Sequence, residues 1–143
     1  MAWLSFVMML AVAGATPVQD ENEAIKTKSG EVGMPATGFG QVVFFRPRAL
    51  MWAVMGCGAF EDDTQLTKLG IGKYHIVPVQ PGKHLYHAGK DKKLLHIQVV
   101  AGQTYFIKCR IASGLIGRGQ VVRSDRDEFI DEAAGLSVAS TAQ

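Results

Sequence analysis

The four histidines are the side chains from which a metal or acid–base site would first be built. His84 and His87 are three positions apart, a spacing that places two side chains on opposite faces of a strand. His75 and His84 flank a Pro-Gly turn and could approach each other across a hairpin, whereas His96 belongs to another apolar run. We expect hydrogen-bonded or solvated strand histidines, with no metal site and no cofactor.

Three consecutive carboxylates, Glu61, Asp62 and Asp63, could serve a calcium site or an acid–base pair. Calcium loops need alternating oxygen ligands over a longer span that ends in a bidentate carboxylate. Aspartates in sequence favour a tight turn. We therefore expect a solvated hairpin turn here.

A glycine-rich segment, G-L-I-G-R-G at 114–119, invites comparison with phosphate-binding loops. It lacks the Lys-Ser/Thr pair that completes such a loop, and no helix is expected directly after it. No G-x-S-x-G motif occurs, and neither cysteine has a histidine beside it. The sequence therefore predicts no catalytic residues and a protein that is not an enzyme.

Cys57 and Cys109 are the two cysteines of the chain. Cys109 shares a strand face with Tyr105, Ile107 and Ile111, so we expect it to point into the core. Two alternatives stay open: a disulfide between the two cysteines, which an oxidising compartment would favour, and two separately buried thiols.

The compartment is indicated by residues 1–15, an uncharged apolar run that ends in Ala13-Gly14-Ala15. This pattern is typical of a cleaved secretory signal, although no Lys or Arg precedes the run. Cleavage is expected between Ala15 and Thr16, with cleavage after Ala13 as the alternative. The run is too short for a stable transmembrane segment, and no cysteine at the cleavage site could carry lipid. We expect a periplasmic or secreted protein that is not a lipoprotein.

Composition bounds the rest of the chain. With 143 residues, 48% hydrophobic and 20% charged, the chain has the composition of one globular domain. Its net charge of +2 is too small to indicate nucleic-acid binding. Residues 16–37 are expected to form a flexible leader, 38–135 a single domain, and 136–143 a disordered tail.

Within the domain, short apolar runs alternate with Gly, Pro and Asp turn signals, which is typical of an all-β fold. The expected class is an antiparallel β-sandwich of seven or eight strands with one short C-terminal helix. Ser124 is expected to cap this helix, which would end near Gly135. The expected strands span 41–46, 52–61, 65–69, 73–79, 83–88, 94–100, 104–111 and 120–123.

Four motifs follow in order: G-Q-V-V-F-F-R-P at 40–47, L-G-I-G-K-Y-H-I-V-P-V-Q-P-G-K-H at 69–84, V-V-A-G-Q-T-Y-F-I-K at 99–108, and S-G-L-I-G-R-G-Q-V-V at 113–122. Together they resemble the exported bacterial domain-of-unknown-function family number twenty-eight forty-six, over 40–129. The resemblance implies a prealbumin-like or carboxypeptidase-regulatory-like β-sandwich, with no established catalytic residues. The chain lacks the lipid-attachment cysteine of many members, and it has Tyr105-Phe106 where many have two tyrosines.

The aromatic residues Trp52, Tyr74, Tyr86 and Tyr105 could stack on a sugar or peptide, but alternation directs most of them inward. The expected function is a non-catalytic exported module that binds an envelope protein, peptide or glycan partner through an edge strand or loop surface. A carrier of a small apolar ligand between the sheets is the second alternative, and an enzyme whose constellation the sequence hides is the third. We expect no nucleic-acid partner.

Overall fold

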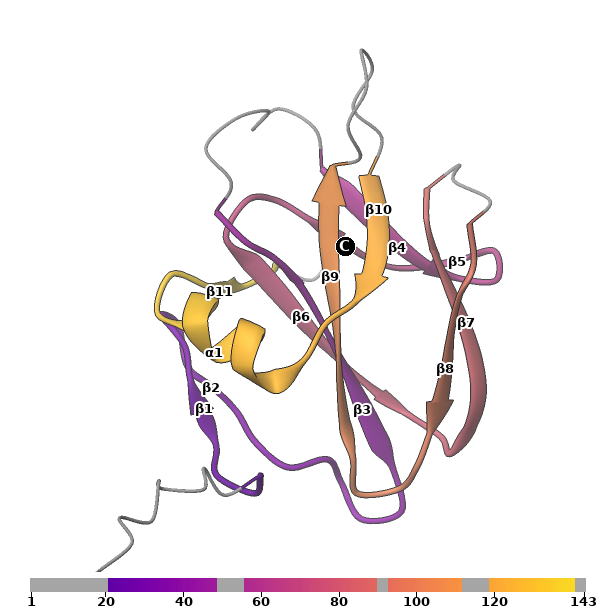
Figure 1. The fold of residues 1–143 in the computed structure, drawn as a ribbon, viewed down its shortest axis with the longest axis horizontal. Helices are drawn as coiled ribbons and strands as arrows, with labels where there is room; N and C mark the ends of the chain where they lie inside the picture. Colours follow the sequence, from indigo (N-terminus) through magenta and orange to yellow (C-terminus); the bar gives the residue numbers. More distant parts are fainter. Residues whose placement is uncertain (1–20, 49–55, 90–92, 112–118, 141–143) are drawn as a thin grey trace, which may run out of the picture.

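A computed structural model describes residues 21–48, 56–89, 93–111 and 119–140. Two stacked sheets form a β-sandwich, with one short helix packed on its outside (Figure 1). The expectation of an all-β sandwich with a C-terminal helix is confirmed. The elements are β1 (Ile25–Lys26), β2 (Glu31–Val32), β3 (Gly40–Arg46), β4 (Cys57–Glu61), β5 (Thr64–Leu69), β6 (Lys73–Val79), β7 (Gly82–Ala88), β8 (Leu95–Val99), β9 (Thr104–Ile111), β10 (Gly119–Arg123), α1 (Arg126–Ala133) and β11 (Ser137–Val138).

Strand pairing divides the described strands into two sheets and a ribbon. The larger sheet has the order β10-β9-β3-β6-β11, and the smaller sheet has the order β5-β4-β7-β8. Most neighbours are antiparallel, but β3 runs parallel to β9 and β11 runs parallel to β6. The larger sheet is therefore mixed rather than purely antiparallel. Parallel neighbours need a long connection, and the chain between β3 and β9 is long enough to provide one.

Both faces of β3 are buried, as its run of four apolar residues, V-V-F-F, indicates. Val42 and Phe44 face the smaller sheet and join the main core cluster, where the Phe44 and Tyr86 rings meet edge to face with centroids 5.3 Å apart. Val43 and Phe45 face the other way, into a second cluster beneath α1. The central strand thus joins two cores.

Helix α1 covers the second cluster by burying Phe129, which contacts the rings of Phe45, Tyr74 and Phe106. Asp125, not Ser124, is the N-cap, because its side chain accepts the backbone N–H of Glu128 at 2.8 Å. The expected cap was wrong by one residue.

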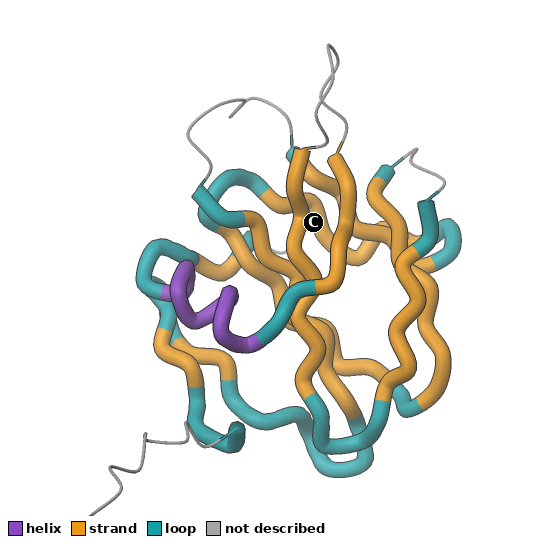
Figure 2. The backbone as a smooth tube through the Cα atoms, in the orientation of Figure 1, coloured by secondary structure: helices purple, strands orange, loops and turns teal. Residues whose placement is uncertain are grey.

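The ends of the domain differ from the expected flexible leader and disordered tail. Residues 25–32 form the ribbon β1–β2, which lies beside α1 (Figure 2), and Ile25 and Val32 enter the second cluster. At the other end Leu136 is buried and β11 pairs with β6. A few apolar side chains in a polar segment, such as Ile25 and Val32, are enough to hold the segment in place when they pack into an apolar cluster of the domain.

Several expectations fall on residues outside the described ranges. These are the cleavage site at Ala15 and Thr16, Trp52 with the start of the expected 52–61 strand, and most of the glycine-rich segment 114–119.

Candidate functional site

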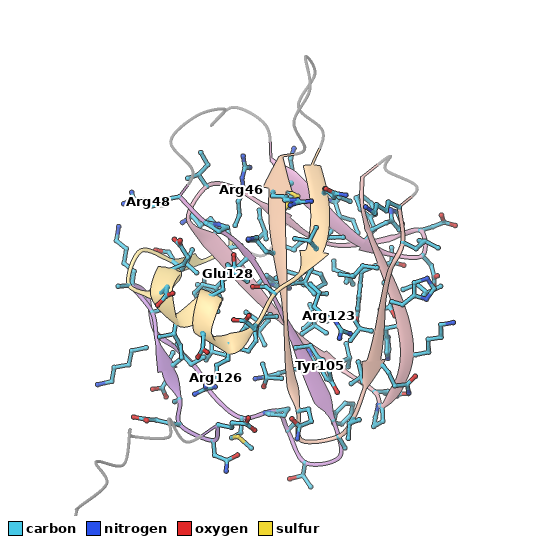
Figure 3. The ribbon with its side chains drawn as sticks, viewed as in Figure 1. Arg46, Arg48, Tyr105, Arg123, Arg126 and Glu128 are labelled. Carbon is cyan, nitrogen blue, oxygen red and sulfur yellow. A yellow bond between two sulfur atoms is a disulfide. The ribbon has the colours of Figure 1, made fainter. Side chains whose placement is uncertain are left out.

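A cavity of about 370 Å³ opens at one edge of the sandwich, where β10 ends and α1 begins. Ile97 of β8 and Phe106 of β9 line its apolar side, and Arg123 and Arg126 line its polar side. Met34, from the segment that follows β2, completes the apolar wall. Figure 3 shows Arg123 and Tyr105 between β10 and β8. The cavity is therefore a mixed apolar and cationic recess that opens beside β8.

Strand β8 has no neighbouring strand along this edge in the part of the chain that the structure describes. Among the described strands it pairs only with β7. The carbonyl of His96 accepts from Arg123 Nη2 at 3.5 Å, and the N–H of Val100 donates to the Tyr105 hydroxyl at 2.8 Å. Since alternate residues of a strand direct their N–H and C=O groups to the same side, Gln98 between them also directs its backbone groups away from β7. Between these two side-chain contacts, the N–H and C=O of Gln98 are the groups of this edge that another strand could pair with.

Two turns close the same end of the molecule. Gly102 has a φ of 82°, which the β8–β9 turn requires, and its N–H donates to the carbonyl of Phe39 at 2.9 Å. The buried amide of Gln41 donates to the carbonyl of Gly33 at 2.6 Å. These bonds hold the 33–39 segment against the β8–β9 turn. Three large apolar side chains on these two segments are exposed by 39–55%: Met34, Phe39 and Val100.

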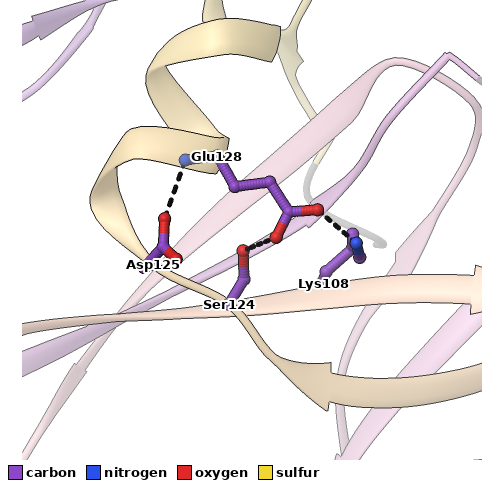
Figure 4. Close-up of polar contacts among 4 residues, drawn as sticks. All are labelled: Lys108, Ser124, Asp125 and Glu128. Atoms are coloured by element: carbon purple, nitrogen blue, oxygen red, sulfur yellow. Dashed lines mark hydrogen bonds and ion pairs between the residues drawn. The ribbon is translucent and has the colours of Figure 1, made fainter.

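A polar network fixes α1 at the inner end of the cavity (Figure 4). The carboxylate of Glu128 accepts from the ammonium of Lys108 on β9 and from the hydroxyl of Ser124. The hydrogen bonds from Lys108 and Ser124 lower the pKa of Glu128 below its ordinary value. The junction that carries Arg123 and Arg126 is therefore anchored to the sheet on both sides.

Two of the four histidines, His84 and His87, have both ring nitrogens within hydrogen-bonding distance of an oxygen atom. His84 on β7 pairs through Nδ1 with the carboxylate of Glu61 at the end of β4, and its Nε2 lies 2.7 Å from the carbonyl of Gln80. Burial lowers the pKa of His84, but the hydrogen bonds to Glu61 and Gln80 and the charges of Glu61 and Asp62 outweigh burial and raise it. With both ring nitrogens bonded, His84 has no lone pair left for a metal ion.

His87 is engaged in the same way on the other face of β7. Its Nε2 lies 2.6 Å from the carbonyl of Asp62, its Nδ1 lies 3.2 Å from the carbonyl of Gly89, and its ring stacks on Phe60. The expected acidic turn is thus held to β7 by two contacts. The carboxylate of Glu61 pairs with His84, and the carbonyl of Asp62 pairs with His87. Within the described residues no group of three or more His, Cys, Asp or Glu could hold a metal ion.

Cys57 on β4 and Cys109 on β9 form a disulfide between the two sheets, with their Cα atoms 6.4 Å apart. Both residues are almost fully buried in the main core. A Cβ added at Gly119 on β10 would lie 3.0 Å from the sulfur of Cys57. A glycine at this position therefore lets β10 pass close over the disulfide.

The tyrosines divide between core and site. Tyr74 is buried and its hydroxyl lies 3.0 Å from that of Thr27, whereas the fully buried Tyr86 hydroxyl has no hydrogen-bond partner. Only Tyr105 of these three lines the cavity. The sequence reasoning missed the contact of Arg123 with the carbonyl of His96, because it depends on which sheet edges meet. The only signal available in the sequence was an arginine shortly before the expected helix.

In the part of the chain that the structure describes, no helix is long and apolar enough to cross a membrane. Comparison with known proteins adds no relative: no protein-family model, no curated protein and no solved structure matches the chain.

Proposed function

We propose that the chain is an exported, non-catalytic β-sandwich module that binds an extended peptide segment of a partner protein at the open edge of β8. One observation carries the proposal. The backbone N–H and C=O groups of Gln98 lie on an edge of β8 that no other described strand covers, and the neighbouring Ile97 lines a cavity. Addition of a strand to such an edge is a recurring mode of peptide recognition, in which main-chain hydrogen bonds give affinity and neighbouring pockets give specificity.

The surroundings of β8 suit an extended segment. A strand added beside β8 would place its inward side chains next to Ile97, which lines the cavity. The exposed side chains of Met34 and Val100 at the same end of the molecule offer apolar contact to the ends of the segment. Large exposed apolar side chains beside a recess are typical of interaction sites rather than of inert surface.

Export is part of the proposal, together with the resemblance to the exported domain family. The disulfide between Cys57 and Cys109 supports it, because structural disulfides persist in oxidising compartments. The apolar run 1–15 supports it independently through its signal-like pattern.

The geometry favours a peptide over a small apolar ligand held between the sheets. The space between the sheets is filled by side chains such as Phe44, Tyr86 and Ile97, each at most 1% exposed. The cavity lies at the edge instead, and charged and polar groups form part of its wall.

The experiment is selection of a displayed library of random eight-residue peptides on the purified chain. We expect selected peptides to bind, and binding to protect the amide of Gln98 from hydrogen exchange. Gln98→Pro removes the N–H at the free edge, where proline is tolerated. We expect it to weaken binding roughly tenfold, because it removes one main-chain hydrogen bond and shifts the backbone locally.

Gln98→Ala is the matched control, because it removes the exposed side chain and keeps the N–H. It should bind as the wild type does. Failure to select any binding peptide, or peptides that leave the exchange of Gln98 unchanged in the wild type, would overturn the proposal even if the proline variant folds poorly.

A further inference from the structure

Arg123 ends β10 and reaches from that strand to the backbone of β8. It lines the cavity, and Figure 3 shows its position beside the end of β10. Among the described residues, Arg123 donates to the carbonyl of His96 at 3.5 Å, which is at the limit of a hydrogen bond. Neither ion pair found among the described residues includes it. A guanidinium has five N–H donors, so most of the donor capacity of Arg123 faces the cavity and solvent.

Other cations of the molecule are better satisfied. Arg110 on β9 holds the side-chain oxygen of Gln120 through two of its nitrogens. Lys108 is paired with Glu128. Arg126 lines the same cavity, but its Nη2 donates to the carbonyl of Glu23. Arg123 is the more exposed of the two guanidiniums that line this cavity, and it is therefore the one placed to take a ligand.

Neither acidic residue of the cavity wall forms an ion pair with Arg123. Asp125 uses its carboxylate to cap α1, and Glu21 is exposed at the start of the described chain. The outward side chains of β7 and β8 beside the edge include Lys83, His96 and Gln98, and none of these three carries negative charge. The cavity wall carries two carboxylates and two guanidiniums, so the attraction for a negatively charged group is local to Arg123.

We propose that the segment bound at β8 carries a carboxylate that pairs with Arg123 inside the cavity. This inference rests on the proposed strand addition and specifies its chemistry. A carboxylate matches the planar fork of arginine with two parallel hydrogen bonds. The apolar wall of Ile97, Phe106 and Met34 accommodates the short stem that carries it. The carboxylate comes either from an acidic side chain or from the C-terminus of the segment.

Synthetic forms of the tightest selected peptide separate these sources. One form has each acidic residue replaced by its amide, one has an amidated C-terminus, and one has both changes. On the wild-type chain we expect the form that lacks the responsible carboxylate to bind roughly 10- to 100-fold more weakly, since charge-assisted pairs are the strong ones. On Arg123→Gln the same change in the peptide should cost little further affinity.

Arg110→Gln is the matched control, because it removes an exposed arginine of the neighbouring strand, and it should keep the wild-type preference. If the fully amidated peptide binds the wild type as tightly as the unmodified one, the inference is overturned while strand addition stands. An equal preference for the carboxylate in Arg123→Gln and wild type also overturns it. Loss of all peptide binding in the wild type removes the proposed function itself.

Discussion

At the scale of single residues, two polar side chains in the smaller sheet show how differently burial acts. His84 is about one-sixth exposed and has both ring nitrogens bonded, whereas the Tyr86 hydroxyl is fully buried without a partner. The rings of these residues stack with centroids 6.1 Å apart. Burial and the charge of Glu61 raise the pKa of Tyr86, so its hydroxyl stays protonated. The hydrogen bonds of His84 therefore stabilise the fold, whereas the buried hydroxyl of Tyr86 loses its contact with water and gains no hydrogen bond in return.

Tyr86→Phe removes that hydroxyl and keeps the ring against Phe44. We expect the free energy of unfolding in urea to stay unchanged or to rise by up to about 1 kcal/mol, because a buried unsatisfied polar group is costly. Tyr74→Phe is the control, since its hydroxyl contacts Thr27, and it should lose about 0.5–1.5 kcal/mol. A loss of more than about 1 kcal/mol in Tyr86→Phe would contradict the assignment.

The His84–Glu61 pair predicts a pH-dependent stability. Because the folded protein raises the pKa of His84 above 6.5, its contribution is fully present below pH 6.5 and is lost as the pH rises through the raised value. His84→Gln should therefore lower the melting temperature more at pH 5.5 than at pH 8.5, relative to the wild type.

His96→Gln, which changes an exposed ring on the next strand, is the comparison variant. It should change the melting temperature little at either pH. An effect of His84→Gln that is larger at pH 8.5 would refute the predicted direction.

At the scale of elements, the two sheets are held together by contacts that join a strand of one sheet to a strand of the other. The disulfide joins β4 of one sheet to β9 of the other, and the Phe44–Tyr86 pair joins β3 to β7. On the outside, α1 is held to β9 by the ion pair of Glu128 and Lys108. These links fix the spacing between β8 and β10, on which the candidate site depends.

The double variant Cys57→Ala/Cys109→Ala tests the covalent link. The disulfide closes a separation of 52 residues, so its removal should lower the free energy of unfolding by about 2–4 kcal/mol, measured in urea. Titration of the denatured, unreduced wild type should detect no free thiol. Two free thiols there would show that the bridge does not form in the protein as purified.

At the scale of the whole molecule, the functional edge is an assembly of distant segments. The cavity draws on residues 21–22 and 34 near one end of the chain, 97 and 102–106 in the middle, and 123–126 near the other end. The exposed apolar side chains at the same end come from the turns that close the sandwich. Only the complete domain forms this surface, so a fragment that lacks either end would lack the site.

Export is tested on the whole chain. Expressed in a host that secretes proteins with such a leader, the chain should be recovered with Thr16 as its first residue, or Gly14 if cleavage follows Ala13. Mass spectrometry of the intact protein measures this directly. Recovery of the soluble protein with Met1 still attached would reject the signal peptide.

The amino-acid sequence by itself determined most strands and the one helix, because apolar periodicity and Gly, Pro and Asp turns act locally. It also placed Cys109 on an inward face with Ile107, as the structure has them. The sequence did not determine which strands become neighbours, because apolar periodicity and turn residues describe each strand separately. The parallel pairing of β3 with β9, the docking of Ile25 and Val32, and the His84–Glu61 pair all depend on contacts between distant segments. For the same reason, only the tertiary structure placed Arg123 opposite the free edge of β8.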